Sequence, residues 1–274
     1  MKRVASIILN RNVPEETDHL VEHLERHDGE MTDVFVVEAG SDADKLSRYC
    51  TWHVDTEEAR RQGLRYSRGM NFALAKLYES GEFQRYDAFF LLTNDTVFED
   101  KATVAPLMDI LDDHRFVGIL SPCSIHWGER LLMDDAPVKY FWFIHNNAYL
   151  MRREFIEAIC NEESPDEMRF LFDGSNFRGY GSESEVIAKA YANDWAAAIA
   201  RDVLVEENES ILLHRADVIK TERYEENLKL YVEEGLRWMK NKYGFNNRWV
   251  MQMYVRLFYD KFFEYHPDLV RYRI

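Results

Sequence analysis

The chain has 274 residues, of which 46% are hydrophobic and 30% charged, so it is long enough to bury one large core. Its net charge of −15 argues against a nucleic-acid partner, because phosphate neutralisation needs a basic face. No apolar run reaches the roughly eighteen residues of a membrane span, and the first residues lack a secretory signal, so we expect a cytoplasmic protein. Its three cysteines lack ligand spacing, and neither a disulfide framework nor a zinc site is expected from them.

Short apolar runs alternate with segments of helical period over the first hundred residues. The apolar runs are residues 4–9, 34–37 and 89–92. Residues 17–24 carry apolar side chains at three- and four-residue spacing, and residues 70–77 are rich in good helix formers. This strand–helix–strand order predicts an α/β fold with a parallel sheet.

Each apolar run ends abruptly in polar side chains. These are Asn10, Arg11 and Asn12 after the first run, Glu38 after the second, and Asn94 and Asp95 after the third. Open α/β sheets bind ligands at the carboxyl ends of their strands, so we expect Asp95 to lie at a pocket. A strand followed by an Asn-Asp turn is also common without any function, and this alternative stays open.

Five segments, in the same order as in the family, resemble motifs of family 2 glycosyltransferases. They are residues 8–12 (ILNRN), 36–42 (VVEAGSD), 91–96 (LLTNDT), 146–154 (NNAYLMRRE) and 179–185 (GYGSESE). The third is similar to the family's form of the Asp-x-Asp metal motif, and the fifth to its GwGeDxD motif. The resemblance favours the rhamnosyltransferase-like branch. It implies a glycosyltransferase A-type fold, which is a single Rossmann-like nucleotide-sugar-binding domain with a mostly parallel central sheet.

The resemblance also implies a division of the chain. Residues 1–216 would form the catalytic domain, with a donor half over about 1–100 and an acceptor half over about 101–216. Residues 217–274 would form a helical C-terminal extension.

Two helices rich in aromatic residues are predicted in the extension, over residues 224–242 and 249–265. From Leu236 to Ile274 it carries eight Lys and Arg against three Asp and Glu. We expect these helices to pack on the core or to form a homodimer interface. Peripheral contact with an anionic membrane is the second alternative.

Residues that match the donor-binding motifs carry polar side chains suited to a nucleotide sugar. The resemblance assigns this role to Asn10, Arg11, Asn12, Glu38, Arg68, Asn71 and Asn94. A carboxylate at Glu38 can accept from a uracil or thymine imide or from a ribose hydroxyl, and Arg11 can stack on the base or grip a phosphate. The plain alternatives are a solvated strand-end acid at Glu38 and an exposed arginine at Arg68.

Asp95 is the expected ligand of Mn²⁺ or Mg²⁺, which would neutralise the leaving diphosphate. Thr93 takes the place of the second acid of the family motif and offers only a hydroxyl. His214 is a second metal candidate, although the family's spacing falls closer to Glu207 and a structural histidine is nearly as well supported.

Glu183 aligns with the catalytic base of the GwGeDxD motif, and Glu185 aligns with its last acid. An inverting transferase needs such a carboxylate to take the acceptor proton. Both residues could instead lie in the first turn of a following helix, where the helix dipole favours a negative charge. Trp127 and the aromatic run 140–143 could stack on sugar faces, although such a run is more often a core strand.

The sequence thus predicts a metal-dependent, inverting glycosyltransferase that moves a hexosyl or deoxyhexosyl group from a UDP- or dTDP-sugar. Its acceptor would be a glycan or a lipid-linked molecule of polysaccharide biosynthesis. The alternative is a nucleotide-sugar-binding relative without catalysis, in which Thr93 and Ser182 mark lost acids.

Overall fold

The computed structural model describes residues 3–144, 148–160, 165–208 and 210–274. Its strands are β1 Val4–Asn10, β2 Thr32–Ala39, β3 Cys50–Val54, β4 Ala88–Thr93, β5 Thr96–Phe98, β6 Val117–Ser124, β7 Val138–Tyr140, β8 Ala148–Arg152 and β9 Ala196–Glu207. Its α-helices are α1 Pro14–Asp28, α2 Glu57–Gln62, α3 Arg65–Glu79, α4 Val104–Asp113, α5 Glu129–Leu132, α6 Arg153–Ile159, α7 Ser182–Ala192, α8 Ser210–Arg215, α9 Tyr224–Tyr243 and α10 Arg248–Tyr265. Short 3₁₀ helices cover Ala43–Lys45, Phe83–Arg85 and Pro267–Tyr272. The expected strands and helices are present with wider bounds, and α1 and α3 are each about twice as long as the segments predicted for them. Of the aromatic run 140–143, only Tyr140 lies in a strand.

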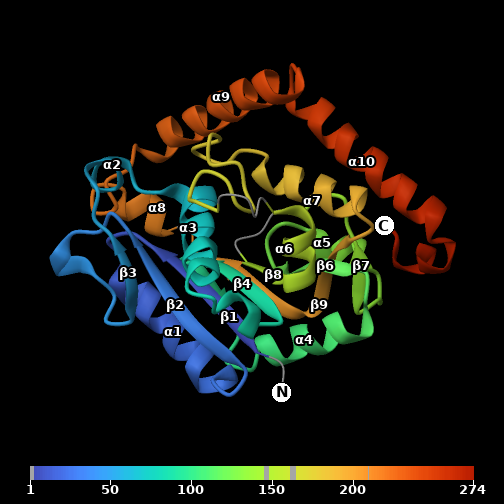
Figure 1. The fold of residues 1–274 in the computed structure, drawn as a ribbon, viewed down its shortest axis with the longest axis horizontal. Helices are drawn as coiled ribbons and strands as arrows, with labels where there is room; N and C mark the ends of the chain where they lie inside the picture. Colours follow the sequence, from blue (N-terminus) through green and yellow to red (C-terminus); the bar gives the residue numbers. More distant parts are fainter. Residues whose placement is uncertain (1–2, 145–147, 161–164, 209) are drawn as a thin grey trace.

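One nine-stranded sheet runs through the described part of the chain in the order β3-β2-β1-β4-β8-β6-β9-β5, with β7 paired to β9 (Figure 1). Neighbours from β3 to β4 are parallel, β8 is antiparallel to both β4 and β6, and β6 is parallel to β9. Six strands therefore share one direction, which confirms the predicted α/β fold with a mostly parallel sheet. The chain leaves β1 towards β2 on one side, whereas β4 lies on the other, and such a reversal of strand order opens a crevice at the carboxyl ends.

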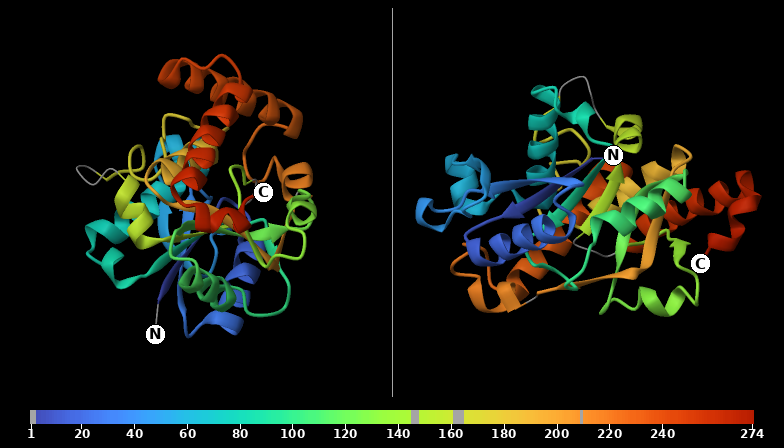
Figure 2. Two further views of the ribbon diagram at one scale, coloured as in Figure 1. Left: turned by 90° about the vertical axis from the view of Figure 1, so that its right-hand side faces the viewer. Right: turned by 90° about the horizontal axis from the view of Figure 1, so that it is seen from below.

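Helices cover both faces of the sheet. Figures 1 and 2 show α1 and α4 together on one side, and α3, α7 and the arch of α9 and α10 on the other. Strand β4 is covered on both faces, because each residue from Ala88 to Leu92 is fully buried. This double burial explains why the sequence of β4 is continuously apolar rather than alternating.

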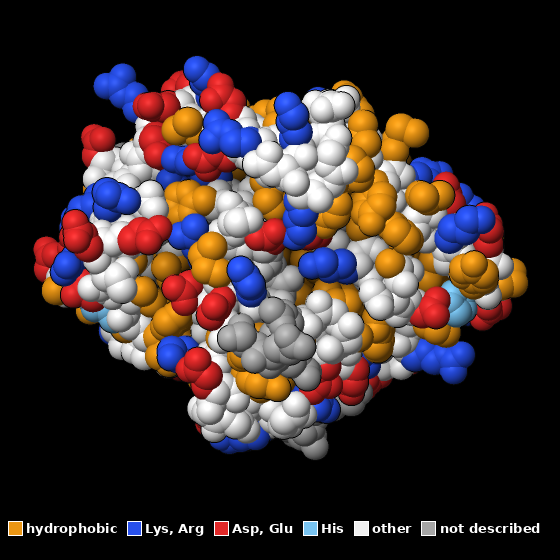
Figure 3. All heavy atoms as spheres, turned by 45° about the horizontal axis from the view of Figure 1, so that its top comes forward, with side chains coloured by type: hydrophobic (Ala, Val, Ile, Leu, Met, Phe, Trp, Pro, Cys, Tyr) orange, Lys and Arg blue, Asp and Glu red, His pale blue; other side chains and the backbone are white. Residues whose placement is uncertain are grey.

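The C-terminal helices divide their aromatic residues between the core and the surface. Helix α10 packs against α7, and Val255, Tyr259 and Phe262 are buried in the main core, which confirms the expected core packing for this helix. The other face of α10 exposes apolar side chains, including Trp249 and Met253, and hydrophobic atoms gather in the upper right of Figure 3. Dimerisation, membrane contact and the domain boundary at residue 217 stay predictions. Among the described helices, none is long and apolar enough to cross a bilayer.

Glu129, the first residue of α5, is a buried acid that we expect to destabilise the fold at neutral pH. Its side chain is 2% exposed, and neither carboxylate oxygen has a hydrogen-bond partner among the described residues. Burial raises the pKa of Glu129 from 4.5 to about 7. The folded state therefore binds the proton more tightly, so stability from this group is present below pH 4.5 and is lost as the pH rises through 7.

The change Glu129→Gln removes this charge, and we expect the free energy of unfolding to rise by about 1–3 kcal/mol at pH 8. The gain should shrink towards pH 5, where the native carboxyl is protonated. Urea unfolding at both pH values measures it, with Glu25→Gln at an exposed position of α1 as the control. A loss of stability at pH 8 would contradict the expectation.

Candidate active site

Two adjoining chambers lie at the carboxyl ends of β1 and β4. The first has a volume of about 450 Å³ and is lined by the ends of these strands, the start of α3 and the segment from Ile219 to Tyr231. The second has a volume of about 310 Å³ and contains Glu183, Trp127 and Tyr149. Both chambers are lined by Tyr66, Thr93, Asp95, Arg178, Glu207 and Tyr231. The arrangement provides room for two ligands that meet at a shared wall.

The polar ends of β1, β2 and β4 form one hydrogen-bond network. The Nδ2 of Asn10 donates to both oxygens of Glu38, at 3.0 and 2.9 Å, and the Nδ2 of Asn94 donates to the Oδ1 of Asn10 at 2.8 Å. The hydroxyl of Ser41 and the backbone N–H of Ser47 also donate to Glu38, at 2.5 and 2.7 Å. Asn10 and Asn94 line the first chamber, whereas the fully buried Glu38 is absent from its lining. Glu38 thus fixes the direction of Asn10.

Gly40 permits the turn that supplies these partners of Glu38. Its φ is +80°, and a Cβ at this position would overlap the backbone carbonyl of Ala59. A glycine is therefore required on both conformational and steric grounds.

Arg11 lines the first chamber, whereas Asn12 is buried behind it. The Nη2 of Arg11 donates to the carbonyl of Arg60 at 2.9 Å, and burial, followed by the charge of Arg65, lowers the pKa of Arg11 to about 10. Asn12 accepts from the backbone N–H of Asp42 at 2.7 Å and donates to the carbonyl of Val218 at 2.7 Å. Asn12 therefore ties the chamber floor to the segment that covers it.

The two candidates on α3 point away from both chambers. Arg68 donates through Nε to the carbonyl of Gly174 at 2.8 Å and pairs through Nη1 with Glu58 at 3.0 Å. The side-chain amide of the fully buried Asn71 makes four hydrogen bonds to backbone groups of residues 167–172. The first turn of the helix instead places Arg65 and Tyr66 in the cleft.

Asp95 lies in the wall shared by the chambers, as the sequence predicts for a pocket residue. Its Oδ1 accepts the hydroxyl of Thr93, and its carbonyl accepts the backbone N–H of Asn208 at 2.8 Å. Thr96 pairs with Glu207 across β5 and β9, which brings Glu207 to the same wall. The backbone of His214 lies in α8, but its side chain is outside the described part of the structure, and so are Asn146 and Asn147.

Glu183 sits in the first turn of α7, and its carboxylate lines the second chamber. The helix begins after Gly181, whose φ is +80° and whose missing Cβ leaves space for Met239 of α9. Burial raises the pKa of Glu183 to about 7. The pKa values of Tyr66 and Tyr231 are raised, mainly by burial and secondly by the nearby charge of Glu183. A carboxyl in this setting can exchange a proton near neutral pH.

Glu185, two residues further on, faces the other way. Its side chain is 2% exposed, pairs with Lys242 at 2.7 Å and accepts the hydroxyl of Tyr243. Lys189 lies 3.7 Å away on the same helix. Glu185 therefore anchors α9 to α7, and it is absent from the lining of both chambers.

The segment after α8 covers the first chamber. The lining residues from this segment and α9 are Ile219, Thr221, Tyr224, Asn227, Leu228 and Tyr231. Glu222 pairs with Arg65 at 3.0 Å and also with Arg178, so two arginines of the cleft connect to this roof. The C-terminal extension is thus part of the site, a contribution that the sequence did not predict.

Comparisons with known proteins identify the fold. No family model and no curated protein matches the sequence. A mannosyltransferase from Pyrobaculum calidifontis, solved with GDP-Man and Mn²⁺, aligns with 86% of this chain and 64% of its own at 13% identity and a TM-score of 0.53. GalNAc-T7, solved with UDP, GalNAc and Mn²⁺, aligns with 89% of this chain and 57% of its own at 9% identity and a TM-score of 0.54. S. aureus TarS, solved with UDP, aligns with 88% of this chain and 73% of the solved chain at 12% identity and a TM-score of 0.53.

This chain thus spans less than two thirds of the first two of these proteins. Such a likeness shows the fold. The chain has the Rossmann-like glycosyltransferase A-type fold, which agrees with the expectation from its sequence motifs.

Proposed function

We propose that the chain is a metal-dependent, inverting glycosyltransferase that uses a UDP- or dTDP-linked sugar. The observation that carries this proposal is the position of Asp95, in the wall between a chamber rich in arginine and a chamber that holds the carboxyl of Glu183. Transfer of a sugar needs the same order of groups: an anion site, a point of diphosphate neutralisation, and a base.

The first chamber suits the nucleotide diphosphate. Arg11, Arg65 and Arg178 all line it, and burial, followed by repulsion from the charge of Arg65, lowers the pKa of Arg11. A diphosphate between them would relieve that repulsion and accept several guanidinium hydrogen bonds. Asn10 and Asn94 offer amide groups to the base or ribose, with Glu38 acting through Asn10 rather than touching the donor.

The wall between the chambers suits a hard divalent cation. Asp95 and Glu207 contribute carboxylates and Thr93 a hydroxyl, which is the oxygen-rich donor set that Mg²⁺ and Mn²⁺ prefer. The bound ion would neutralise charge on the leaving diphosphate. We assign Asp95 and Glu207 as its protein ligands, with Glu207 at the place where the family spacing expects a histidine. His214 stays a further candidate.

Glu183 is the proposed general base. Its carboxylate takes the proton of an acceptor hydroxyl as that oxygen attacks the anomeric carbon from the side opposite the diphosphate. The bond from the anomeric carbon to the diphosphate oxygen breaks, and its electron pair leaves with the nucleotide. Configuration at the anomeric carbon is inverted in this displacement.

The second chamber suits a carbohydrate acceptor. Trp127 and Tyr149 supply aromatic faces on which sugar rings stack, next to the carboxyl of Glu183. The proposal includes a glycan or lipid-linked acceptor. It also includes a hexosyl or deoxyhexosyl donor, as in the rhamnosyltransferase-like branch.

A donor panel tests the function. Purified protein with Mn²⁺ and each of several UDP-, dTDP- and GDP-sugars should release free nucleotide diphosphate from one class of donor, faster than without metal. Binding of a donor by calorimetry without any hydrolysis or transfer would instead support the non-catalytic alternative. Absence of both binding and turnover across the panel would contradict the proposed function.

A further inference from the structure

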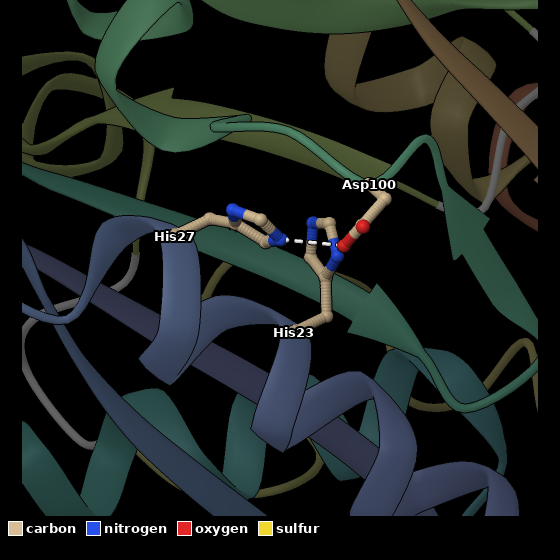
Figure 4. A group of neighbouring side chains, drawn as sticks. All are labelled: His23, His27 and Asp100. Atoms are coloured by element: carbon tan, nitrogen blue, oxygen red, sulfur yellow. Dashed lines mark hydrogen bonds and ion pairs between the residues drawn. The ribbon is translucent and has the colours of Figure 1, made fainter.

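Three potential metal ligands meet outside the cleft, where α1 passes the segment between β5 and α4. His23 and His27 are four residues apart on α1, so they lie on one face of the helix. Asp100 comes from the segment after β5, and Figure 4 shows the three side chains converging. One ligand atom from each lies within 4.8 Å of the others.

The surroundings hold these side chains in place. The carboxylate of Asp28, at the buried end of α1, accepts the backbone N–H groups of Thr103 and Ala105 at 2.9 and 3.1 Å. These bonds fix the segment that carries Asp100 against the helix that carries both histidines. The Nε2 of His27 is 2.8 Å from the Oδ1 of Asp100.

The ring of His23 is fixed by two contacts. It stacks on Phe98 with the ring centres 5.6 Å apart, and its Nε2 lies 3.3 Å from the hydroxyl of Thr103. The imidazole of His23 is thereby held in one orientation beside His27 and Asp100.

A surface ion pair between Arg26 and Asp100 explains this arrangement less well than a metal site does. Arg26 lies 3.5 Å from Asp100, but the side chains of both are largely exposed, so the pair contributes little. It also does not account for the second histidine, which packs beside the first with ring centres 4.9 Å apart.

We propose that His23, His27 and Asp100 form a zinc site that braces α1 against the segment between β5 and α4. Two imidazole nitrogens and one carboxylate oxygen suit Zn²⁺, with water completing its coordination, whereas Mg²⁺ and Mn²⁺ favour oxygen ligands. None of the three residues lines either chamber of the cleft. The site is therefore separate from the cation proposed at Asp95.

Titration of the chelator-treated full chain with ZnCl₂ tests this site. Calorimetry should show one tight equivalent, and zinc should raise the melting temperature by mass action. His27→Gln and Asp100→Ala should each weaken this binding by about tenfold or more. His19→Gln is the matched control, because His19 is exposed one turn before His23 and outside the ligand group. The Asp95→Asn variant should keep the tight equivalent.

The Asp100→Ala variant distinguishes the loss of a ligand from a folding defect. The Asp100 side chain is 83% exposed, so this variant should keep the native circular dichroism spectrum. Co²⁺ adds a spectroscopic signature, since its visible absorption reports imidazole and carboxylate ligands and should disappear with His27→Gln. The proposal is overturned by a wild-type chain without a stoichiometric zinc equivalent. The proposal is also overturned if His27→Gln and Asp100→Ala both keep the zinc affinity of the wild type. The same holds if His19→Gln or Asp95→Asn loses as much zinc affinity as these two variants.

Discussion

The change Asp95→Asn should reduce sugar transfer by about a hundredfold to a thousandfold. Asn keeps the size of the side chain and can still accept the hydroxyl of Thr93, so the fold of the wall should persist. What is lost is the negative charge that, in the proposed function, would hold the cation beside the leaving diphosphate. Such electrostatic stabilisation is worth several kcal/mol, and each 1.4 kcal/mol or so is a factor of ten in rate.

The measurement is kcat/KM for the best donor as a function of Mn²⁺ concentration. Wild-type protein should show saturable activation by the metal, and Asp95→Asn should show little or none. Asp109→Asn, at an exposed position on α4, is the matched control and should behave as the wild type. Unchanged metal activation in Asp95→Asn would remove Asp95 from the metal site.

Sequence patterns predicted the elements of the fold because they report burial directly. The apolar run of β4 and that of β1, which only Ser6 interrupts, follow from the burial of both strands, and the polar residues that end them mark where the strands leave the core. The pattern therefore predicts Asn10, Arg11, Asn94 and Asp95 at one edge of the sheet, and all four line the first chamber.

Sequence reasoning was weaker where a side chain could face either of two ways. Arg68 and Asn71 match a donor motif, yet both bind backbone groups of residues 167–174, while Arg65 and Tyr66, at the start of α3, line the cleft. The pattern of α3 is apolar on the sheet side and mixed elsewhere, so it cannot tell which polar residues meet a ligand.

The roof of the first chamber could not be predicted, because it depends on long-range packing. Tyr224 and Tyr231 belong to α9, whose apolar residues were expected to pack on the core or on a second copy, and nothing in the local sequence shows that they line the first chamber. The same packing decides between the two acids of α7, since Lys242 and Tyr243 of α9 bind Glu185 and leave Glu183 in the cleft.

The change Glu183→Gln should lower kcat by about a hundredfold or more, the usual size of a general-base effect, while donor affinity changes little. Glutamine has the same shape but cannot take the acceptor proton. In contrast, Glu185→Gln breaks a buried ion pair with Lys242, so its main effect should be a lower free energy of unfolding. Steady-state kinetics, donor calorimetry and urea unfolding on both variants separate the two roles. A larger loss of kcat in Glu185→Gln, at full folding, would transfer the base to that residue.

The pH dependence of the rate distinguishes a base from a residue that only shapes the chamber. Burial raises the pKa of Glu183 to about 7, and a base works only when deprotonated, so kcat/KM of the wild type should rise with pH through about 7 and then level off. This rise should be absent from the residual activity of Glu183→Gln, and it should persist in Glu185→Gln, because Glu185 does not reach the chamber. Residual activity of Glu183→Gln that still rises through pH 7 would show that another group takes the proton, and Glu183 would then retain only a part in binding the acceptor.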